Sequence, residues 1–270
     1  MTIRFLHLTD LHLRDPEDEA ALGAEAPSVR LRGVLDRAAR LDPAPAFIAI
    51  TGDLADDGAP GAYRLLAEIL QGTNLPVFMA MGNHDDRAAF RAAFGETGEG
   101  PVCRDAAVAG LHVIVLDTLV PGRTGGALSD AALAALDGAL TRHSDLPRLV
   151  LLHHPPRAPW DTDNAWDALT GASTEALAAR LAGHSVAGLL AGHVHYDGLR
   201  MWQGAPLVLN TGLSATIDPT DTETLHVFPG ASYGFCRWTP ESGLAVSFVP
   251  VAPARDEIAT VSPDILQGGG

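Results

Sequence analysis

Five short clusters of Asp, Asn and His side chains constrain this chain more than any other feature of its sequence. Each follows an apolar run that is typical of a β-strand; the runs cover residues 3–8, 47–50, 77–81, 149–152 and 186–191. The clusters are Asp10-Leu11-His12, Gly52-Asp53-Leu54-Ala55-Asp56, Gly82-Asn83-His84-Asp85, His153-His154 and Gly192-His193-Val194-His195. A strand that ends in Asp or His delivers that side chain to the edge of a rigid sheet. We therefore expect the clusters to converge at one edge.

The residue types in these clusters predict a metal site. Carboxylate, imidazole and amide groups together suit hard or borderline divalent ions, and the clusters contain no thiolate that would indicate a structural zinc knuckle. His193 and His195 are separated by one residue, so in an extended segment both imidazoles lie on the same face and can reach neighbouring ions. A single Asp-x-His arises by chance in many proteins, whereas five clusters in this order predict a common site.

In these motifs the chain resembles the calcineurin-like metallophosphoesterases. The signature of that family is D-x-H, GD-x-x-D/E, GNH-D/E, a lone His and GH-x-H, and every element is present here in order between Asp10 and His195. Three segments narrow the resemblance to the branch with class III cyclic-nucleotide phosphodiesterases and bacterial glycerophosphodiesterases. They are Gly82-Asn83-His84-Asp85-Asp86-Arg87, His153-His154-Pro155-Pro156 and Gly192-His193-Val194-His195.

The resemblance implies a site for two metal ions about 3.5–4 Å apart, which share one bridging carboxylate. The bridging role falls to Asp53. The first ion would take Asp10, His12, Asp53 and His195, and the second would take Asp53, Asn83, His153 and His193. These ligands admit Fe, Mn, Zn or Co, so the native metal pair stays open.

His84 follows the expected ligand Asn83 in the sequence but is not needed to complete either set of metal ligands. We expect it to bind the phosphate and to protonate or polarise the leaving oxygen, with Asp56 orienting its imidazole as the Asp–His pair of the family does. Asn83 and Arg87 are further candidates for contact with the substrate, although Arg87 could equally form a salt bridge at a helix start. We expect Asp85 to hold the loop and His154 to support the ligands without binding a metal.

The function that follows is hydrolysis of a small phosphodiester by a metal-bridging hydroxide. A 3′,5′-cyclic nucleotide and a glycerophosphodiester remain close alternatives as the substrate. A phosphomonoesterase is less favoured, because such enzymes usually clamp a dianion with several arginines and only Arg87 lies within a motif. A non-catalytic scaffold is disfavoured because all seven ligands and His84 are present.

Strands and helices alternate as far as His195, and short strands follow. We expect helices at 28–40, 61–70, 86–94, 129–140 and 173–181, a loop at the acidic segment 15–26, and strands at 111–116, 199–202, 207–209, 233–238 and 244–249. This order predicts an α/β fold with four layers, α/β/β/α, in which two mixed sheets are flanked by helices. One domain over 1–250 and a C-terminal arm or tail over 251–270 are expected, and the 157–172 loop could line a substrate pocket.

Composition excludes several classes of function. The formal charge of −15 and the lack of a basic stripe argue against nucleic acid polymers as partners. The chain has no lysine, which excludes Schiff-base chemistry and a Walker lysine. No apolar run is long enough to span a bilayer, and the two cysteines form no disulfide framework. We therefore expect a cytoplasmic protein without a membrane partner, which could form a homo-oligomer.

Overall fold

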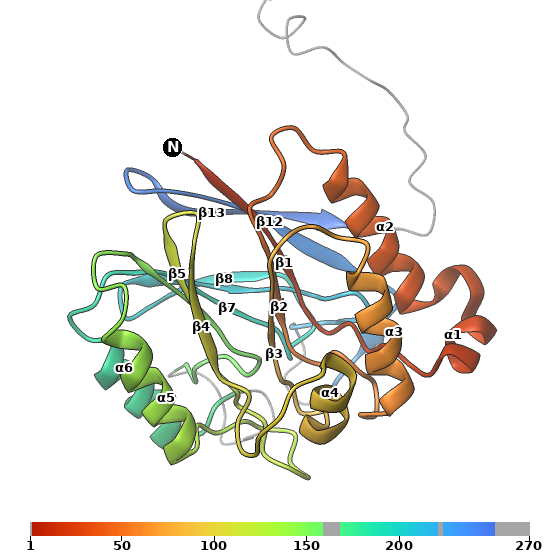
Figure 1. The fold of residues 1–270 in the computed structure, drawn as a ribbon, viewed down its shortest axis with the longest axis horizontal. Helices are drawn as coiled ribbons and strands as arrows, with labels where there is room; N and C mark the ends of the chain where they lie inside the picture. Colours follow the sequence, from red (N-terminus) through yellow and green to blue (C-terminus); the bar gives the residue numbers. More distant parts are fainter. Residues whose placement is uncertain (1, 159–167, 221–223, 252–270) are drawn as a thin grey trace, which may run out of the picture.

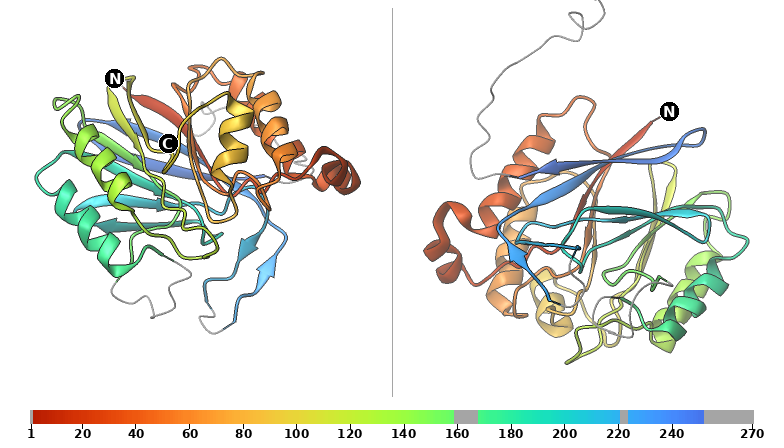
Figure 2. Two further views of the ribbon diagram at one scale, coloured as in Figure 1. Left: turned by 60° about the horizontal axis from the view of Figure 1, so that its bottom comes forward. Right: turned by 180° about the vertical axis from the view of Figure 1, so that it is seen from behind.

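The computed structural model describes residues 2–158, 168–220 and 224–251. Two β-sheets pack face to face, and helices cover the outer face of each sheet (Figure 1 and Figure 2). This arrangement confirms the predicted four-layer α/β/β/α sandwich. Most of the predicted tail, and the loop residues Asn164 and Trp166, lie outside the described residues.

The first sheet contains the strands that precede three of the five clusters. Its order is β13-β12-β1-β2-β3. The strands are β1 (Ile3–Leu8), β2 (Ile48–Thr51), β3 (Val77–Ala80), β12 (Ser232–Thr239) and β13 (Gly243–Pro250). β1, β2 and β3 are parallel, whereas β12 and β13 are antiparallel additions, so the sheet is mixed. The carboxyl ends of the three parallel strands therefore meet at one edge.

The second sheet carries the strands that precede the two histidine clusters. Its order is β4-β5-β6-β7-β9-β8. The strands are β4 (Arg104–Val108), β5 (Leu111–Val115), β6 (Arg148–Leu151), β7 (Val186–Ala191), β8 (Gly198–Trp202) and β9 (Ala205–Leu209). β5, β6, β7 and β9 are parallel, and β4 and β8 pair antiparallel at the edges. A short ribbon of β10 (Thr216–Ile217) and β11 (Val227–Phe228) extends beyond the sheets, as Figure 2 shows.

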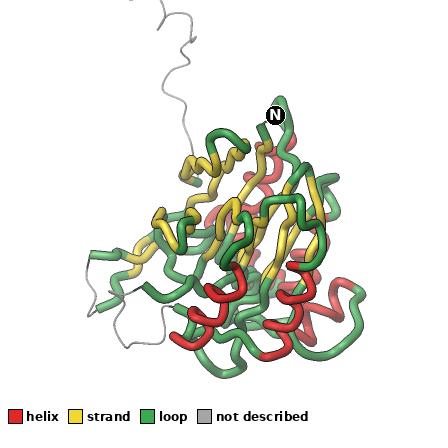
Figure 3. Tube along the Cα trace, turned by 90° about the vertical axis from the view of Figure 1, so that its left-hand side faces the viewer, coloured by secondary structure: helices red, strands yellow, loops and turns green. Residues whose placement is uncertain are grey.

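The helices confirm all five predicted helical segments to within two residues at each end. The predicted segments correspond to α2 (Pro27–Ala39), α3 (Pro60–Leu70), α4 (Arg87–Phe94), α5 (Asp130–Leu140) and α6 (Gly171–Leu181). The structure has a further helix, α1 (Pro16–Leu22), before them. Ser129 caps α5 as expected, because its side chain accepts a hydrogen bond from the backbone N–H of Ala132 at 3.2 Å. Figure 3 distinguishes the helices, strands and loops along the chain.

The prediction of a loop over 15–26 is wrong, because α1 and a 3₁₀ turn at Gly23–Glu25 occupy this segment. Its acidic residues stand in the first turn of α1, where negative charge is favourable next to the helix N-terminus. Glu19 is also buried, since its carboxylate accepts the backbone N–H groups of Arg14 at 2.9 Å and Ser28 at 3.0 Å. The charges that suggested a solvated loop therefore stabilise a helix.

Three hydrophobic clusters fill the spaces between the layers. The first packs α2, α3 and α4 on the first sheet, and the second packs α5 and α6 on the second sheet. The third lies between the two sheets and contains Phe5 and Phe47, whose rings stack at 4.6 Å. Each central strand is therefore buried on both faces, which holds the carboxyl ends of the strands in fixed positions.

Within the described residues, no helix has the length and apolar character that crossing a bilayer requires.

Candidate metal centre

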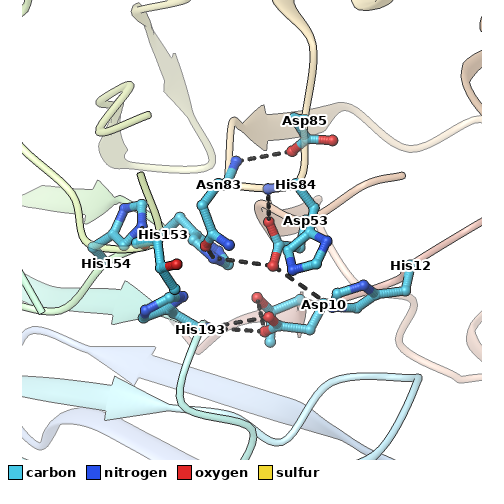
Figure 4. Close-up of polar contacts among 12 residues, drawn as sticks. Asp10, His12, Asp53, Asn83, His84, Asp85, His153, His154 and His193 are labelled. Atoms are coloured by element: carbon cyan, nitrogen blue, oxygen red, sulfur yellow. Dashed lines mark hydrogen bonds and ion pairs between the residues drawn. The ribbon is translucent and has the colours of Figure 1, made fainter. Parts of the chain in front are cut away.

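The carboxyl ends of five strands bring the predicted ligands together. Asp10 and His12 follow β1, Asp53 follows β2, Asn83 follows β3, His153 follows β6, and His193 and His195 follow β7. Figure 4 shows most of these side chains converging between the two sheets, with His84 beside them. The convergence that we expected from the sequence is therefore present.

The backbone at the ligands is strained. Asp10, His12 and Asp53 each have a φ of 46°, and His193 and His195 have φ values of 72° and 51°. L-residues rarely adopt this left-handed region, and holding one there costs about 1–3 kcal/mol. Such conformations persist only where the surrounding structure enforces them, and they cluster at functional sites. Here they turn the chain sharply at the strand ends and aim the side chains at a common point.

Glycines in the motifs leave room for the ligands. A Cβ atom at Gly82 would lie 2.1 Å from Oδ1 of Asp53, and a Cβ atom at Gly192 would lie 2.4 Å from Oδ2 of Asp10. Neither position has space for a larger residue. The glycines of the GN and GH motifs are therefore required by close packing against the carboxylates.

One group of donors consists of Asp10, His12, Asp53 and His195, whose ligating atoms all lie within 4.8 Å of one another. Nε2 of His12 is 3.6 Å from Oδ2 of Asp53, and Nε2 of His195 is 3.3 Å from Oδ1 of Asp10. Nδ1 of His195 donates to the carbonyl of Ala215 at 3.1 Å, because a carbonyl oxygen only accepts. This bond leaves the Nε2 lone pair directed at the carboxylates. The group coincides with the set expected for the first ion.

A second group lies on the other side of Asp53. Nε2 of His153 is 3.4 Å from Oδ2 of Asp53 and 3.2 Å from Oδ1 of Asn83. Nδ1 of His153 donates to the carbonyl of Thr51 at 2.7 Å, so Nε2 again faces the oxygens. The ring of His193 is 5.0 Å from that of His153, and its backbone N–H donates to Asp10 at 3.1–3.2 Å. The four residues expected for the second ion are therefore adjacent.

The electrostatics of both groups fit cations. Nε2 of His12 is buried and has no hydrogen-bond partner among the described residues. In its neutral form His153 directs the lone pair of Nε2 toward the facing oxygens of Asp53 and Asn83, so that three donor atoms surround the same space. Burial opposes a charge on His153, but the carboxylates of Asp53 and Asp10 outweigh it and raise the pKa of His153 to about 9. Burial alone would raise the pKa of Asp53, but the neighbouring imidazoles, His153 foremost, outweigh it and hold that pKa well below its usual range. This donor set suits divalent metal ions.

His84 is held by the main chain of Asp56 and not by its carboxylate. Nδ1 of His84 donates to the carbonyl oxygen of Asp56 at 2.6 Å, and its backbone N–H donates to Oδ1 of Asp53 at 2.9 Å. The Asp56 carboxylate instead accepts from Nδ1 of His12 at 2.9 Å and pairs with Nε of Arg14 at 3.1 Å. The Asp56 carboxylate therefore pairs with His12, a candidate metal ligand, and not with His84. The sequence could not show which histidine binds the Asp56 carboxylate, because both His12 and His84 contact Asp56 in the folded protein.

Asp85 holds the loops of the centre, as expected. Its buried carboxylate accepts the backbone N–H groups of Leu54, Ala55 and Gly82 at 2.8–3.2 Å, and the hydroxyl of Tyr63 at 2.9 Å. Burial and the nearby Asp53 raise the pKa of Asp85 to about 6. Asp85 thereby ties the loop after β2 to the loop after β3.

His154 supports its neighbour without a free nitrogen. Its Nδ1 accepts from the hydroxyl of Thr118 at 2.7 Å, and its Nε2 donates to the carbonyl of Thr124 at 2.8 Å. Burial keeps the ring neutral, since it lowers the pKa of His154 well below the usual value. His154 also forms a group of potential ligands with His153 and His193, but both of its ring nitrogens are already hydrogen-bonded, so its supporting role stays a prediction.

The expected contact of Arg87 with substrate is not supported. Its guanidinium forms two bonds to the carboxylate of Asp117, from Nε at 2.7 Å and from Nη2 at 2.8 Å. The alternative of a salt bridge at a helix start is the observed one, since Arg87 is the first residue of α4. Sequence reasoning missed Asp117, because it lies in no motif and 30 positions away from Arg87.

A further group, Asp105, His112 and His143, also brings three potential ligands together. Both oxygens of the Asp105 carboxylate already accept hydrogen bonds, from the guanidinium of Arg142 and from Nε2 of His112 at 2.8 Å. This group therefore forms an ion-pair network at the edge between β4 and β5.

Comparisons with known proteins show which family the chain belongs to. The family model described as calcineurin-like phosphoesterase matches residues 3–197. A probable cyclic nucleotide phosphodiesterase from Rhodococcus erythropolis is 36% identical over 220 residues, 79% of this chain and 71% of that protein. A cAMP/cGMP dual specificity phosphodiesterase from Mycobacterium tuberculosis is 34% identical over 221 residues, 80% of this chain and 69% of that protein. A solved dimetal phosphatase from Danio rerio has the same fold, with a TM-score of 0.63 and 16% identity over 93% of this chain and 99% of that chain. These findings confirm the predicted enzyme class, a hydrolase of phosphoric esters. The chain belongs to the calcineurin-like phosphoesterase family.

Proposed function

We propose that this protein is a dinuclear metal-dependent phosphodiesterase and that its substrate is a 3′,5′-cyclic nucleotide. The observation that carries the proposal is the pair of donor groups that share Asp53 and lie next to His84. The first group, Asp10, His12, Asp53 and His195, would hold one divalent ion. The second group, Asp53, Asn83, His153 and His193, would hold the other.

When bound, two such ions neutralise the phosphate oxygens and lower the pKa of a water molecule to near neutrality. The protein contributes the geometry. Hydrogen bonds from Nδ1 of His153 and His195 to backbone carbonyls fix each ring with Nε2 directed at the site. Asn83 ligates through a neutral oxygen, so it adds no negative charge that would repel an anionic substrate.

His84 would protonate the oxygen of the leaving alcohol. Its side chain is exposed beside the donor groups, and its Nδ1 proton is fixed on the Asp56 carbonyl. The second nitrogen, Nε2, is therefore the one that can deliver a proton to the leaving oxygen. The 2.9 Å bond from the backbone N–H of His84 to Asp53 links the position of this ring to the shared carboxylate.

The charges around the centre favour a diester over a monoester. A diester carries one negative charge, whereas a monoester carries close to two near neutral pH. Arg14 and Arg87, the two arginines closest in sequence to the ligands of the first sheet, are both paired with carboxylates. With a formal charge of −15 on the chain, a dianion lacks the arginine clamp that a phosphomonoesterase usually offers.

The relatives favour the cyclic nucleotide among the small diesters. Three relatives that match over 78–80% of this chain at 33–36% identity are named as cyclic nucleotide phosphodiesterases. A probable glycerophosphodiester phosphodiesterase from Arcobacter nitrofigilis matches over 76% of the chain at the lower identity of 27%. A glycerophosphodiester is the other substrate that the motifs leave open.

The test is hydrolysis of a substrate panel by metal-loaded protein. The panel contains cyclic AMP, cyclic GMP, glycerophosphocholine, bis(p-nitrophenyl) phosphate and p-nitrophenyl phosphate. We expect kcat/KM for a cyclic nucleotide to exceed that for the monoester by at least about tenfold, or about 1.4 kcal/mol. A preference for glycerophosphocholine would assign a glycerophosphodiester as the substrate in place of a cyclic nucleotide. A preference for the monoester would contradict the proposed phosphodiesterase activity.

A further inference from the structure

Arg87, three residues after His84, forms an ion pair with the buried carboxylate of Asp117. Nε and Nη2 of Arg87 donate to the two oxygens of Asp117 at 2.7 and 2.8 Å, and Nη2 also donates to the carbonyl of Leu119 at 2.6 Å. The side chain of Asp117 is 0% exposed and that of Arg87 is 21% exposed. A guanidinium that binds both oxygens of a carboxylate fixes orientation as well as distance.

The pair connects the two halves of the sandwich. Arg87 begins α4, and Phe90 of that helix packs in the hydrophobic cluster on the outer face of the first sheet. Asp117 follows β5, a strand of the second sheet. Figure 1 shows α4 and β5 in different layers of the fold.

Asp117 is itself held firmly by the backbone. Its carboxylate accepts the N–H groups of Val102 at 2.6 Å and Leu119 at 3.0 Å, in addition to the two bonds from Arg87. A buried carboxylate with this many donors has one position only, so it transmits that position to the guanidinium. The planar guanidinium of Arg87 can bind both oxygens of this carboxylate in one orientation, whereas the single ammonium of a lysine cannot.

The residue after Asp117 contacts the other side of the centre. The Thr118 hydroxyl bonds to Nδ1 of His154 at 2.7 Å, and His154 is adjacent to the candidate ligand His153. Asn83 and His84 lie three to four residues before Arg87. The dipeptide 117–118 therefore touches both segments that meet at the 3.2 Å contact between Asn83 and His153.

We propose that Arg87 and Asp117 are a positioning pair, which sets the place of Asn83 and His84 relative to His153 across the two sheets. The catalytic part of this inference rests on the proposed phosphodiesterase activity. The metal-binding part does not, since Asn83 and His153 belong to the second donor group in either case. Outer partners of metal ligands typically affect affinity or activity by about 10–100-fold.

The experiment compares Arg87→Lys and Asp117→Asn with wild type and with Arg91→Lys. Arg91 lies one turn further along α4, and the one described hydrogen bond of its side chain goes to the carbonyl of Gly100, so its replacement controls for changes in the helix. For the two test variants we expect kcat to fall about 10–100-fold and the affinity for the weaker of two added Mn²⁺ ions to fall about tenfold. Arg91→Lys should stay within about twofold of wild type in both.

The second readout separates positioning from folding. Because a displaced His84 protonates the leaving group poorly, the loss should be at least about tenfold larger for an alkyl diester than for bis(p-nitrophenyl) phosphate. This ratio does not depend on how much of a variant is folded. Equal losses on both substrates together with unchanged Mn²⁺ affinity would show a purely structural ion pair and overturn the inference. If wild type hydrolyses no diester, the proposed function fails, and the Mn²⁺ affinities of the variants alone decide on the pair.

Discussion

Replacing the Asp56 carboxylate should lower the affinity of the protein for one metal ion and leave proton delivery by His84 intact. The carboxylate accepts from Nδ1 of His12 at 2.9 Å, whereas His84 is bound to the Asp56 carbonyl, which the substitution retains. Loss of an outer partner costs about 10–100-fold in metal affinity. The Asp56 side chain is 33% exposed, and asparagine keeps an oxygen that can accept from His12, so Asp56→Asn should lie at the low end. We expect about a tenfold weaker affinity for one of two ions, or about 1.4 kcal/mol.

The assay is a metal titration of Asp56→Asn, of Asp56→Ala and of Asp57→Asn as the control. Asp57 is exposed and accepts from the backbone N–H of Ala59 at 3.1 Å, so its variant should bind both ions as wild type does. Asp56→Ala, which has no acceptor, should approach a hundredfold loss for that ion. The reasoning would be refuted if Asp56→Asn bound both ions normally but showed a steeper dependence of kcat on the leaving group, because Asp56 would then act on His84.

Four further variants test the centre and the strand β1 that leads into it. His84→Ala should keep two ions while kcat falls by about two to four orders of magnitude, and loss of an ion on elemental analysis would make His84 a ligand. Asp53→Ala should lower the affinity for both ions, whereas Asn83→Ala should lower the affinity for chiefly one. If calorimetry showed the same pattern of affinity losses for both variants, a carboxylate shared by the two ions would be contradicted. Burial lowers the pKa of His7 from 6.5 to about 3, so only the unfolded chain binds a proton there between these values. Relative to His7→Gln, stability in urea should therefore fall by up to about 1.4 kcal/mol per pH unit below pH 6.5, and a difference that is independent of pH would exclude this.

The sequence was sufficient for the parts of the fold that are governed by local pattern. Apolar runs that end in Asp, Asn or His predicted β1, β2, β3, β6 and β7 and the edge at which their ligands meet. The helix cap at Ser129 was also readable, because capping depends on a single residue and its next turn. The ribbon of β10 and β11 was missed, since two-residue strands have no detectable alternation.

Contacts between distant residues were beyond the sequence. The ion pair of Arg87 spans 30 positions, and the bond of His12 to Asp56 spans 44. Which of two histidines an aspartate orients depends on the direction of its carbonyl and carboxylate, which only the folded loop determines. The acidic segment before Ala26 was likewise misjudged, because the burial of Glu19 depends on two backbone N–H groups outside α1.

The central claim is that two ions held around Asp53 enable hydrolysis of a cyclic nucleotide. Its most direct test is to titrate metal-free protein with Mn²⁺ while following cyclic AMP hydrolysis. We predict that activity rises to its plateau at two equivalents per chain and stays low at one. A plateau at one equivalent would contradict the shared-carboxylate centre, and no hydrolysis at saturation would contradict the proposed activity.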